Sequence, residues 1–260
     1  MKPLILIGND DGFQAKGLRT LIDVAREVGD VIVMCTGHNA SAKSFSLTTY
    51  VPLRAQLMEH EDATNQQGAL TLYATNGTPA DTIKLGLEHF CPRRPDLMLS
   101  GINHGSNASI NVVYSGTMGA ALEAVINGIP AVGFSILEHD ADADFSVCQP
   151  YIRDIVRRVV SQGIPQGVCL NVNFPYQEKG PIQGVKVCRA ARAVWQNSYA
   201  KRTDPRGRDY FWMTGDFVCT DMAEDTDEWA LAHSYVSVVP MRPDYTAHDM
   251  ISNINSIINN

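Results

Sequence analysis

The sequence predicts an α/β fold of the Rossmann-like, three-layer α/β/α type, in which a mostly parallel sheet lies between two layers of helices. Short apolar runs without polar alternation, such as residues 3–7 and 131–134, are typical of strands buried on both faces. Segments with apolar residues at helical spacing, such as residues 17–28, separate these runs. Because strands and helices keep alternating, we expect six or more mostly parallel strands.

Local signals place the elements of the first hundred residues. Leu18, Leu21 and Ile22 follow helical spacing after the first strand. Thr78 can cap a helix that has Pro79 at its first position. The expected elements are strands 3–7, 30–35, 50–57, 70–75 and 97–99, helices 17–28 and 78–90, a candidate functional loop 36–49 rich in Gly, Ser, Asn and Thr, and a polar connection 59–68.

The alternation continues from residue 115 and changes near Pro175. Ser115 and Gly116 open a predicted helix that ends before Gly128. Beyond Pro175 the chain is richer in aromatic residues and arginines, and residues 204–207 predict a turn between two extended arms. The remaining expected elements are helix 117–127, strand 131–134, helix 147–160, strand 168–174, hairpin 182–218, helix 224–232, strand 235–239 and helix 246–258.

This change of character predicts two parts. Residues 1–175 are expected to form a Rossmann-like catalytic core, and residues 176–260 a C-terminal extension with the protruding hairpin, a final strand and a terminal helix. Exposed aromatic residues on such a hairpin are typical of a subunit contact. We therefore expect the hairpin and the terminal helix to serve oligomerisation, as a homodimer or homotetramer.

Composition excludes several classes of partner. The chain has 260 residues, 45% of them hydrophobic, and a formal net charge of -7. An acidic balance argues against a nucleic-acid polymer as the main partner, since that binding depends on clustered Lys and Arg. The first apolar run is too short for a signal peptide, and no stretch approaches the length of a membrane span. Six scattered cysteines fit reduced thiols, so we expect a cytoplasmic protein.

The end of the first predicted strand carries two adjacent carboxylates, Asp10 and Asp11, within the turn from Gly8 to Gly12. Ligands bind at the carboxyl ends of strands in open α/β sheets. Two neighbouring aspartates repel each other unless a cation neutralises them, so the pair indicates a metal site. A solvated Asp-Asp-Gly turn is the alternative interpretation.

Three further segments of small polar residues follow predicted strands or open a helix, namely 39–42, 100–105 and 114–119. If they meet the acidic turn at one edge, two carboxylates, a hydroxyl and an amide form an all-oxygen set that suits magnesium or manganese. The helix start at Ser115 offers free amides to an anion such as phosphate. Taken singly, Ser41 could be a loop residue, Asn103 a turn residue and Ser115 a helix cap.

Several tempting residues have ordinary alternatives. His104 and Lys43 could contact an anion at this edge, but surface histidines and lysines are usually only solvated. The turn after the first strand lacks the glycine fingerprint of dinucleotide binding, and no Gly-x-Ser-x-Gly nucleophile elbow is present. A dinucleotide-dependent oxidoreductase and an esterase are therefore disfavoured.

The same segments resemble the SurE family of survival-protein nucleotidases over nearly the whole chain. The matching motifs are Ile7-Gly8-Asn9-Asp10-Asp11-Gly12, the Ser41 loop with residues 44–48, Gly77-Thr78-Pro79-Ala80-Asp81, Ser100-Gly101-Ile102-Asn103, Tyr114-Ser115-Gly116-Thr117, Asn171-Val172-Asn173-Phe174-Pro175, Asp225-Thr226-Asp227 and Tyr235-Val236-Ser237-Val238-Val239-Pro240. The sequence departs from the family pattern at residues 35–38, Ser106, Ser109 and Ser234. These departures bear on loop geometry near the substrate.

The resemblance implies a metal-dependent phosphatase acting on nucleoside monophosphates, at 5′ and also at 3′ positions. It implies one divalent ion per subunit, Mg²⁺ or Mn²⁺, bound by Asp10, Asp11, Ser41 and Asn103. It also implies exchange of elements between subunits. The residues that would surround the phosphate are Asn9, Ser100, Gly101, Ser115, Gly116 and Thr117.

A metal-activated water is the expected nucleophile, and Asp10 and Asp11 are the candidate catalytic residues. A covalent phosphoaspartate ranks lower, because phosphatases of that type generally separate their two aspartates by one residue. The alternative function is a receiver-like, magnesium-binding signalling module without phosphatase activity. That module needs an aspartate at the carboxyl end of a central strand, whereas Asp30 and Asp96 precede their predicted strands.

Overall fold

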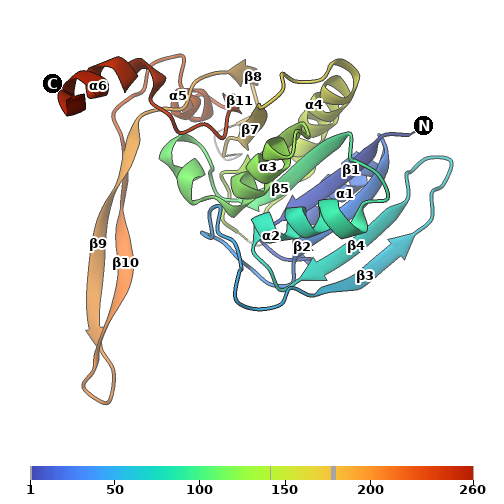
Figure 1. The fold of residues 1–260 in the computed structure, drawn as a ribbon, viewed down its shortest axis with the longest axis horizontal. Helices are drawn as coiled ribbons and strands as arrows, with labels where there is room; N and C mark the ends of the chain where they lie inside the picture. Colours follow the sequence, from blue (N-terminus) through green and yellow to red (C-terminus); the bar gives the residue numbers. More distant parts are fainter. Residues whose placement is uncertain (1, 141, 177–179, 260) are drawn as a thin grey trace.

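The structure, a computed structural model, describes residues 2–140, 142–176 and 180–259. Within these residues a nine-stranded sheet has the order β3-β4-β2-β1-β5-β6-β7-β11-β8, and β9 and β10 form a separate ladder (Figure 1). Neighbouring strands of the large sheet are parallel except β3 with β4 and β11 with β7. Its strands are β1 Leu4–Asn9, β2 Asp30–Thr36, β3 Ala55–Glu61, β4 Leu70–Thr75, β5 Leu97–His104, β6 Ala131–Ile136, β7 Cys169–Phe174, β8 Gly184–Val187 and β11 Tyr235–Met241.

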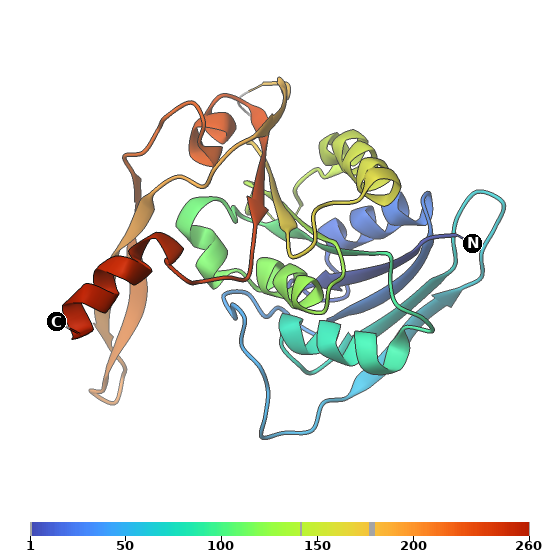
Figure 2. The same cartoon turned by 45° about the horizontal axis from the view of Figure 1, so that its top comes forward.

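Helices cover both faces of this sheet (Figure 2). Helices α1 (Lys16–Arg26) and α4 (Gln149–Gln162) pack together on one face, and α2 (Pro79–Leu85) and α3 (Gly116–Ile126) on the other. Strand β1 contributes to both layers, because Ile5 and Ile7 join one apolar cluster and Leu6 joins the other. The predicted Rossmann-like α/β class is therefore confirmed.

The remaining helical elements are short. They are a π-helical turn Gly86–Phe90, the 3₁₀ turns Ser109–Tyr114, Ser146–Cys148 and His248–Met250, helix α5 (Asp227–Ala232) and helix α6 (Ile251–Asn259). The predicted helix 78–90 corresponds to α2 followed by the π-helical turn, and Thr78 caps it as expected. No helix among the described residues has the length and apolar character needed to cross a membrane.

Two strand predictions were wrong in extent. Strand β3 runs over Ala55–Glu61, not 50–57, and extends into the predicted polar connection. As an exposed edge strand it carries charged residues, and Glu59 and Glu61 pair with Arg19 and Arg26 of α1. Strand β5 continues beyond residue 99 to His104, because its outer part pairs again with β6 after a register shift.

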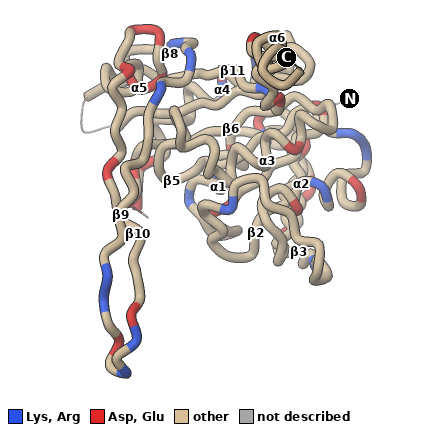
Figure 3. The backbone as a smooth tube through the Cα atoms, turned by 60° about the vertical axis from the view of Figure 1, so that its left-hand side comes forward, with Lys and Arg blue, Asp and Glu red and all other residues tan. Residues whose placement is uncertain are grey.

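The predicted hairpin is present but shorter than expected. It consists of β9 (Ala193–Thr203) and β10 (Asp209–Cys219), which form a long antiparallel arm that projects from the sheet (Figure 1). Both signs of charge occur along the arm (Figure 3), including the ion pair between Lys201 and Asp209. Helix α6 projects on the same side and buries none of its residues in this chain.

Strand β8 was missed, because residues 182–192 were assigned to the arm. Residues 184–187 instead pair with β11 at the end of the main sheet. Strands from both sides of residue 175 therefore belong to one sheet, and β11 pairs with β7. The division into parts 1–175 and 176–260 stays a prediction about organisation.

Close packing between α1 and β5 can be tested at Gly17. A Cβ atom at this position would lie 2.2 Å from the carbonyl oxygen of Ile102. Gly-to-Ala replacement inside a helix normally stabilises by about 1 kcal/mol. Here β5 must move instead, so Gly17→Ala should lower the free energy of unfolding by roughly 1–3 kcal/mol in urea denaturation. Thr20→Ala in the same helix should stay within about 0.5 kcal/mol of the parent chain. An unchanged unfolding free energy for Gly17→Ala would contradict the close contact.

Candidate functional site

Asp10 is buried at the carboxyl end of β1, against the first turn of α3. The residue is only 2% exposed, and its Oδ1 accepts a hydrogen bond of 2.7 Å from Oγ1 of Thr117. A Cβ atom on Gly116 would lie 2.6 Å from Asp10 Oδ2, so the missing side chain makes room for the carboxylate. The Ala40 amide donates to the Asp10 carbonyl at 2.7 Å and holds the 36–41 loop beside the acidic turn.

The two adjacent carboxylates have strongly shifted acidities. Burial, followed by the neighbouring charge of Asp11, raises the pKa of Asp10 to about 7. Burial raises the pKa of Asp11 to about 6, although the backbone amide of His104 donates a hydrogen bond that lowers it. Among the described residues, Oδ2 of Asp11 has no hydrogen-bond partner. The pair is therefore a buried acidic centre, and the interpretation as a solvated turn does not describe it.

Ser41 and Asn103 reach the same region from distant segments. Ser41 is exposed, and its Oγ donates to Oδ1 of Asn39 at 2.7 Å. Asn103 is buried within β5 rather than in a turn after it. Its Nδ2 donates to the carbonyl oxygens of His104 and Gly105, at 3.0 and 2.8 Å, which leaves its Oδ1 for another partner.

The start of α3 combines a cap with free amides. Oγ of Ser115 accepts a hydrogen bond from the Met118 amide at 3.0 Å, so Ser115 is a helix cap as its ordinary interpretation proposed. The amides of the first turn have no partner within the helix. One of them, the amide of Thr117, donates to the Asp10 carboxylate, and anions are favoured at such a terminus.

Two more predicted residues are buried behind this surface. Asn9 and Ser100 are fully buried, and the polar atoms of both side chains lack a hydrogen-bond partner among the described residues. Buried polar groups are normally paired. Their lack of partners next to the acidic pair indicates that a ligand or ordered water satisfies them.

A cavity of about 770 Å³ opens at this edge of the sheet. Six of the predicted residues line it, namely Asp10, Ser41, Asn103, His104, Ser115 and Gly116. The predicted residues absent from its lining are Asn9, Asp11, Lys43, Ser100, Gly101 and Thr117. Lys43 is exposed elsewhere on the loop, and burial lowers the pKa of the lining residue His104. The structure thus gathers segments that are far apart along the chain, from Asp10 to Gly116, around one cavity.

The far wall of this cavity was missed by the sequence analysis. It is formed by the root of the arm and by α5, through Trp195, Asn197, Phe217 and Glu228. The aromatic residues of the arm were predicted to form a subunit contact, which stays a prediction; the structure adds that Trp195 and Phe217 line the cavity. No local spacing signals such a wall, because it depends on the direction in which the arm leaves the sheet.

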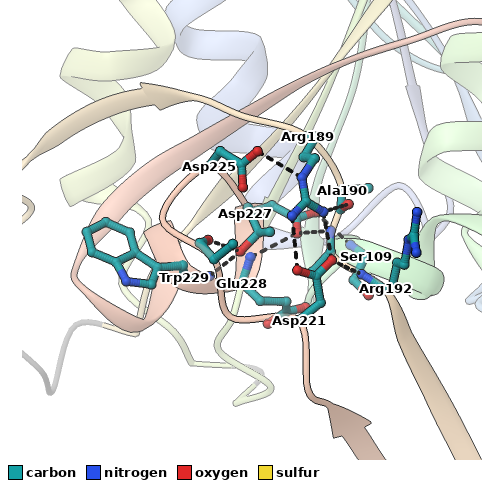
Figure 4. Close-up of polar contacts among 12 residues, drawn as sticks. Ser109, Arg189, Ala190, Arg192, Asp221, Asp225, Asp227, Glu228 and Trp229 are labelled. Atoms are coloured by element: carbon teal, nitrogen blue, oxygen red, sulfur yellow. Dashed lines mark hydrogen bonds and ion pairs between the residues drawn. The ribbon is translucent and has the colours of Figure 1, made fainter.

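A buried carboxylate, Asp227, fixes the arm root, the residues next to the start of β9 and the end of β10, to the cavity loop, residues 105–115 (Figure 4). Asp227 accepts hydrogen bonds from the backbone amides of Ser109, Ala191 and its neighbour Glu228, at 2.7, 2.8 and 2.8 Å. Burial raises the pKa of Asp227, and these three amides counteract the shift. Outside this contact, Arg189 pairs with Asp221 and Asp225. Asp227 therefore joins the 3₁₀ turn Ser109–Tyr114 to the start of β9.

The structure is that of an α/β protein with a mostly parallel sheet and an acid-containing cavity at the carboxyl end of β1, the edge where ligands bind in open α/β sheets. A family model described as "Survival protein SurE" matches residues 5–197, and the chain belongs to this family. The resemblance carried by the motifs is thereby confirmed.

Relatives match over nearly their full lengths. The protein named "5'-nucleotidase SurE" from Flavobacterium psychrophilum is 48% identical over 98% of this chain and 97% of its own. The protein of the same name from Christiangramia forsetii is 47% identical over 98% and 96%. The crystal structure of the SurE protein from Aquifex aeolicus superimposes with a TM-score of 0.79, at 32% identity, over 98% of this chain and 99% of that chain.

The buried acidic pair predicts a stability that depends on pH in chelator-treated protein. Because the pKa of Asp10 rises from 3.8 to about 7 on folding, the folded state binds the proton more tightly than the unfolded chain. The free energy of unfolding should therefore fall as pH rises from about 4 to about 7, by roughly 1.4 kcal/mol for each pH unit in that interval.

Asp10→Asn keeps an acceptor for Thr117 but removes the charge, so it should raise the unfolding free energy more at about pH 8 than at about pH 4. Urea denaturation across this range measures the effect, and the exposed Asp62→Asn should follow the parent chain. Parallel curves for Asp10→Asn and the parent chain would contradict the buried charge.

Asp227→Ala should destabilise the chain by roughly 3 kcal/mol, because three buried amides lose a charged acceptor. Asp225→Ala removes only an exposed ion pair with Arg189 and should cost about 1 kcal/mol or less. Thermal and urea unfolding of the two variants gives the comparison. Equal losses would show that the Asp227 contacts add nothing beyond a surface pair.

Proposed function

We propose that this chain is a metal-dependent phosphomonoesterase that hydrolyses nucleoside monophosphates to nucleoside and inorganic phosphate. The 5′ phosphate is the main substrate position, with 3′ phosphates as a second one. The observation that carries the proposal is the pair formed by Asp10, which is buried against the first turn of α3 and lines the cavity, and Asp11, whose Oδ2 is buried without a partner among the described residues. The name "5'-nucleotidase SurE" of the relatives supports the same activity.

The donor set fits a hard divalent cation, Mg²⁺ or Mn²⁺. Asp11 has an unpartnered buried oxygen, Asn103 has an uncommitted Oδ1, and the pKa values of both aspartates are raised in the absence of positive charge. Among the described residues, no group of three or more His, Cys, Asp or Glu side chains is placed to hold a metal, which agrees with a set of only two carboxylates. We assign the ligand positions to Asp10, Asp11, Ser41 and Asn103. A cation bound there neutralises phosphoryl charge and lowers the pKa of a bound water.

The chain itself supplies the anion site and the proton acceptor. The amide of Gly116 and the hydroxyl of Ser115 lie at the cavity, where they can bind the oxygens of a phosphate and stabilise charge that develops during displacement. Thr117 supports this anion site by donating to the Asp10 carboxylate. We assign Asn9, Ser100 and Gly101 to the buried side of the phosphate site. We assign the proton of the attacking water to one of the two aspartates, Asp10 or Asp11, although ligation by a cation lowers the basicity of a carboxylate.

The receiver-like alternative gains no support. Such a module takes phosphate on an aspartate at the carboxyl end of a central strand. Asp30 begins β2 and Asp96 precedes β5, so both lie at the opposite ends of their strands.

Assembly and location follow as parts of the proposal. The arm and α6 expose Trp212, Met213, Ile257 and Ile258, which fits contacts with further copies in a homodimer or homotetramer. All six cysteines are free, as expected for a reducing cytoplasm, where we place the protein. The partner of the site is a nucleoside monophosphate, with no role for a nucleic-acid polymer or a membrane.

Phosphate release from 5′- and 3′-nucleotides with Mg²⁺ or Mn²⁺ tests the function. The chain should release phosphate with added metal and lose this activity after chelation. Asp11→Asn should lower kcat/KM by a factor on the order of 100 or more, because one carboxylate of the metal and proton site is lost. Asp23→Asn on the exposed face of α1 is the matched control and should retain the parent rate. Absence of release from every nucleotide, or full activity of Asp11→Asn, would refute the proposal.

A further inference from the structure

The cavity is much larger than a phosphate requires, and its two ends differ in chemistry. One end holds Asp10, Ser115 and Gly116, where the proposed reaction takes place. The other end is built by the arm root and α5. Ligand cavities typically combine apolar walls with a few polar groups that fix orientation. The second end therefore has the make-up of a subsite for the rest of the substrate.

An ordered aromatic surface forms one side of this end. Trp195 and Phe217 are neighbours across the β9–β10 ladder, with ring centroids 5.6 Å apart in an edge-to-face arrangement. The Trp195 indole N–H donates to Oδ1 of Asn111 at 2.8 Å, which fixes the ring against the cavity loop. A nucleobase stacks favourably on an aromatic side chain, whichever base it is. A ring held in advance loses little entropy when a base packs against it.

The only acidic side chain that lines this end, among the described residues, is Glu228. It is half-buried, and its carboxylate oxygens accept no hydrogen bond from the described residues, although its backbone amide donates to Asp227. Burial and the charge of Asp227 raise the pKa of Glu228 to about 7. Donors supplied by a ligand would relieve this desolvation. A carboxylate accepts at two oxygens, so it matches two neighbouring donors.

We propose that Glu228 is a specificity-determining residue that accepts hydrogen bonds from the N1–H and N2–H groups of a guanine base lying against Trp195 and Phe217. The inference rests on the proposed function, because it assigns the base preference of the same cavity. Adenine presents an acceptor at N1, which faces an ionised carboxylate unfavourably. The two hydroxyls of the ribose are the other neighbouring donor pair on a nucleotide, and a deoxyribose substrate separates them from the base.

The test compares the parent chain with Glu228→Gln on GMP, AMP and 2′-deoxy-GMP, at a pH well above 7, where Glu228 is ionised. The parent chain should prefer GMP to AMP. A glutamine amide can donate to N1 of adenine and accept from its amino group. Glu228→Gln should therefore lower kcat/KM for GMP by about tenfold, mainly through KM, and raise it for AMP. Glu224→Gln, an exposed glutamate that pairs with Lys186 outside the cavity, is the matched control.

A small phosphomonoester without a base, ribose 5-phosphate, separates this inference from the proposed function. Both chains should hydrolyse it at equal rates, and failure to release phosphate from any substrate would refute the function itself. Hydrolysis with identical GMP-to-AMP ratios in Glu228→Gln and Glu224→Gln would overturn the role of Glu228. A ribose-over-deoxyribose preference that disappears in Glu228→Gln, with an unchanged GMP-to-AMP ratio, would overturn the base contact and assign the carboxylate to the sugar.

Discussion

The burial of the Asp10 carboxylate against the start of α3 is the constraint around which the site is organised. Strand β1 is buried along its whole length, so the chain turns only after it has delivered Asp10 to the edge of the sheet. Gly116 leaves the space that the carboxylate occupies, and Thr117 donates to it. Without these two residues a charged group at this depth would lack both room and a partner, and desolvation would not be offset. The helix start and the strand end therefore depend on each other.

The loop that closes the cavity is held from two sides. Behind it, the Asn107 amide donates to Oδ1 of Asn173 at 2.9 Å, and Nδ2 of Asn107 donates to Oγ of Ser135 at 2.7 Å. Nδ2 of Asn171 donates to the Asn107 carbonyl at 2.8 Å. In front, Asp227 binds the Ser109 amide. Every one of these groups is buried, and satisfied buried networks fix a single arrangement. The cavity is thus preorganised by β6, β7 and α5 rather than by the loop alone.

Much of the fold could be predicted because its signals are local. Apolar runs identified β1, β2 and β6, the apolar positions around Asn171 and Asn173 identified β7, and the cap at Thr78 placed the start of α2. The sequence analysis misplaced strand bounds where a strand has polar residues, either because it lies at the edge of the sheet or because it carries candidate site residues. Strand β3 was shifted because its exposed face is charged, and β5 was cut short because Ser100 and Asn103 resemble loop residues. Strand β8 has only four residues and is recognisable only through its pairing with β11.

The site was predictable to the extent that topology dictates it. Parallel strands bring their carboxyl ends to one edge, so the order of strands and polar segments along the chain is enough to group Asp10, Ser41 and Asn103. The contribution of Trp195 and Glu228 could not be obtained in this way, since residues far along the chain reach the cavity through the path of the arm. The role of Asp227 likewise depends on a contact with Ser109, more than a hundred positions away.

The β9–β10 arm lines the cavity with one end and exposes aromatic residues along the rest of its length. Its root, at Trp195 and Phe217, walls the cavity, while its outer part carries exposed Tyr199, Phe211 and Trp212 into solvent. The two strands are paired without interruption from root to tip, so the cavity wall and the exposed aromatic residues belong to one ladder. The register of this ladder therefore sets the position of the cavity wall and of the outer aromatic residues together, whereas Asp10 belongs to β1 and its turn.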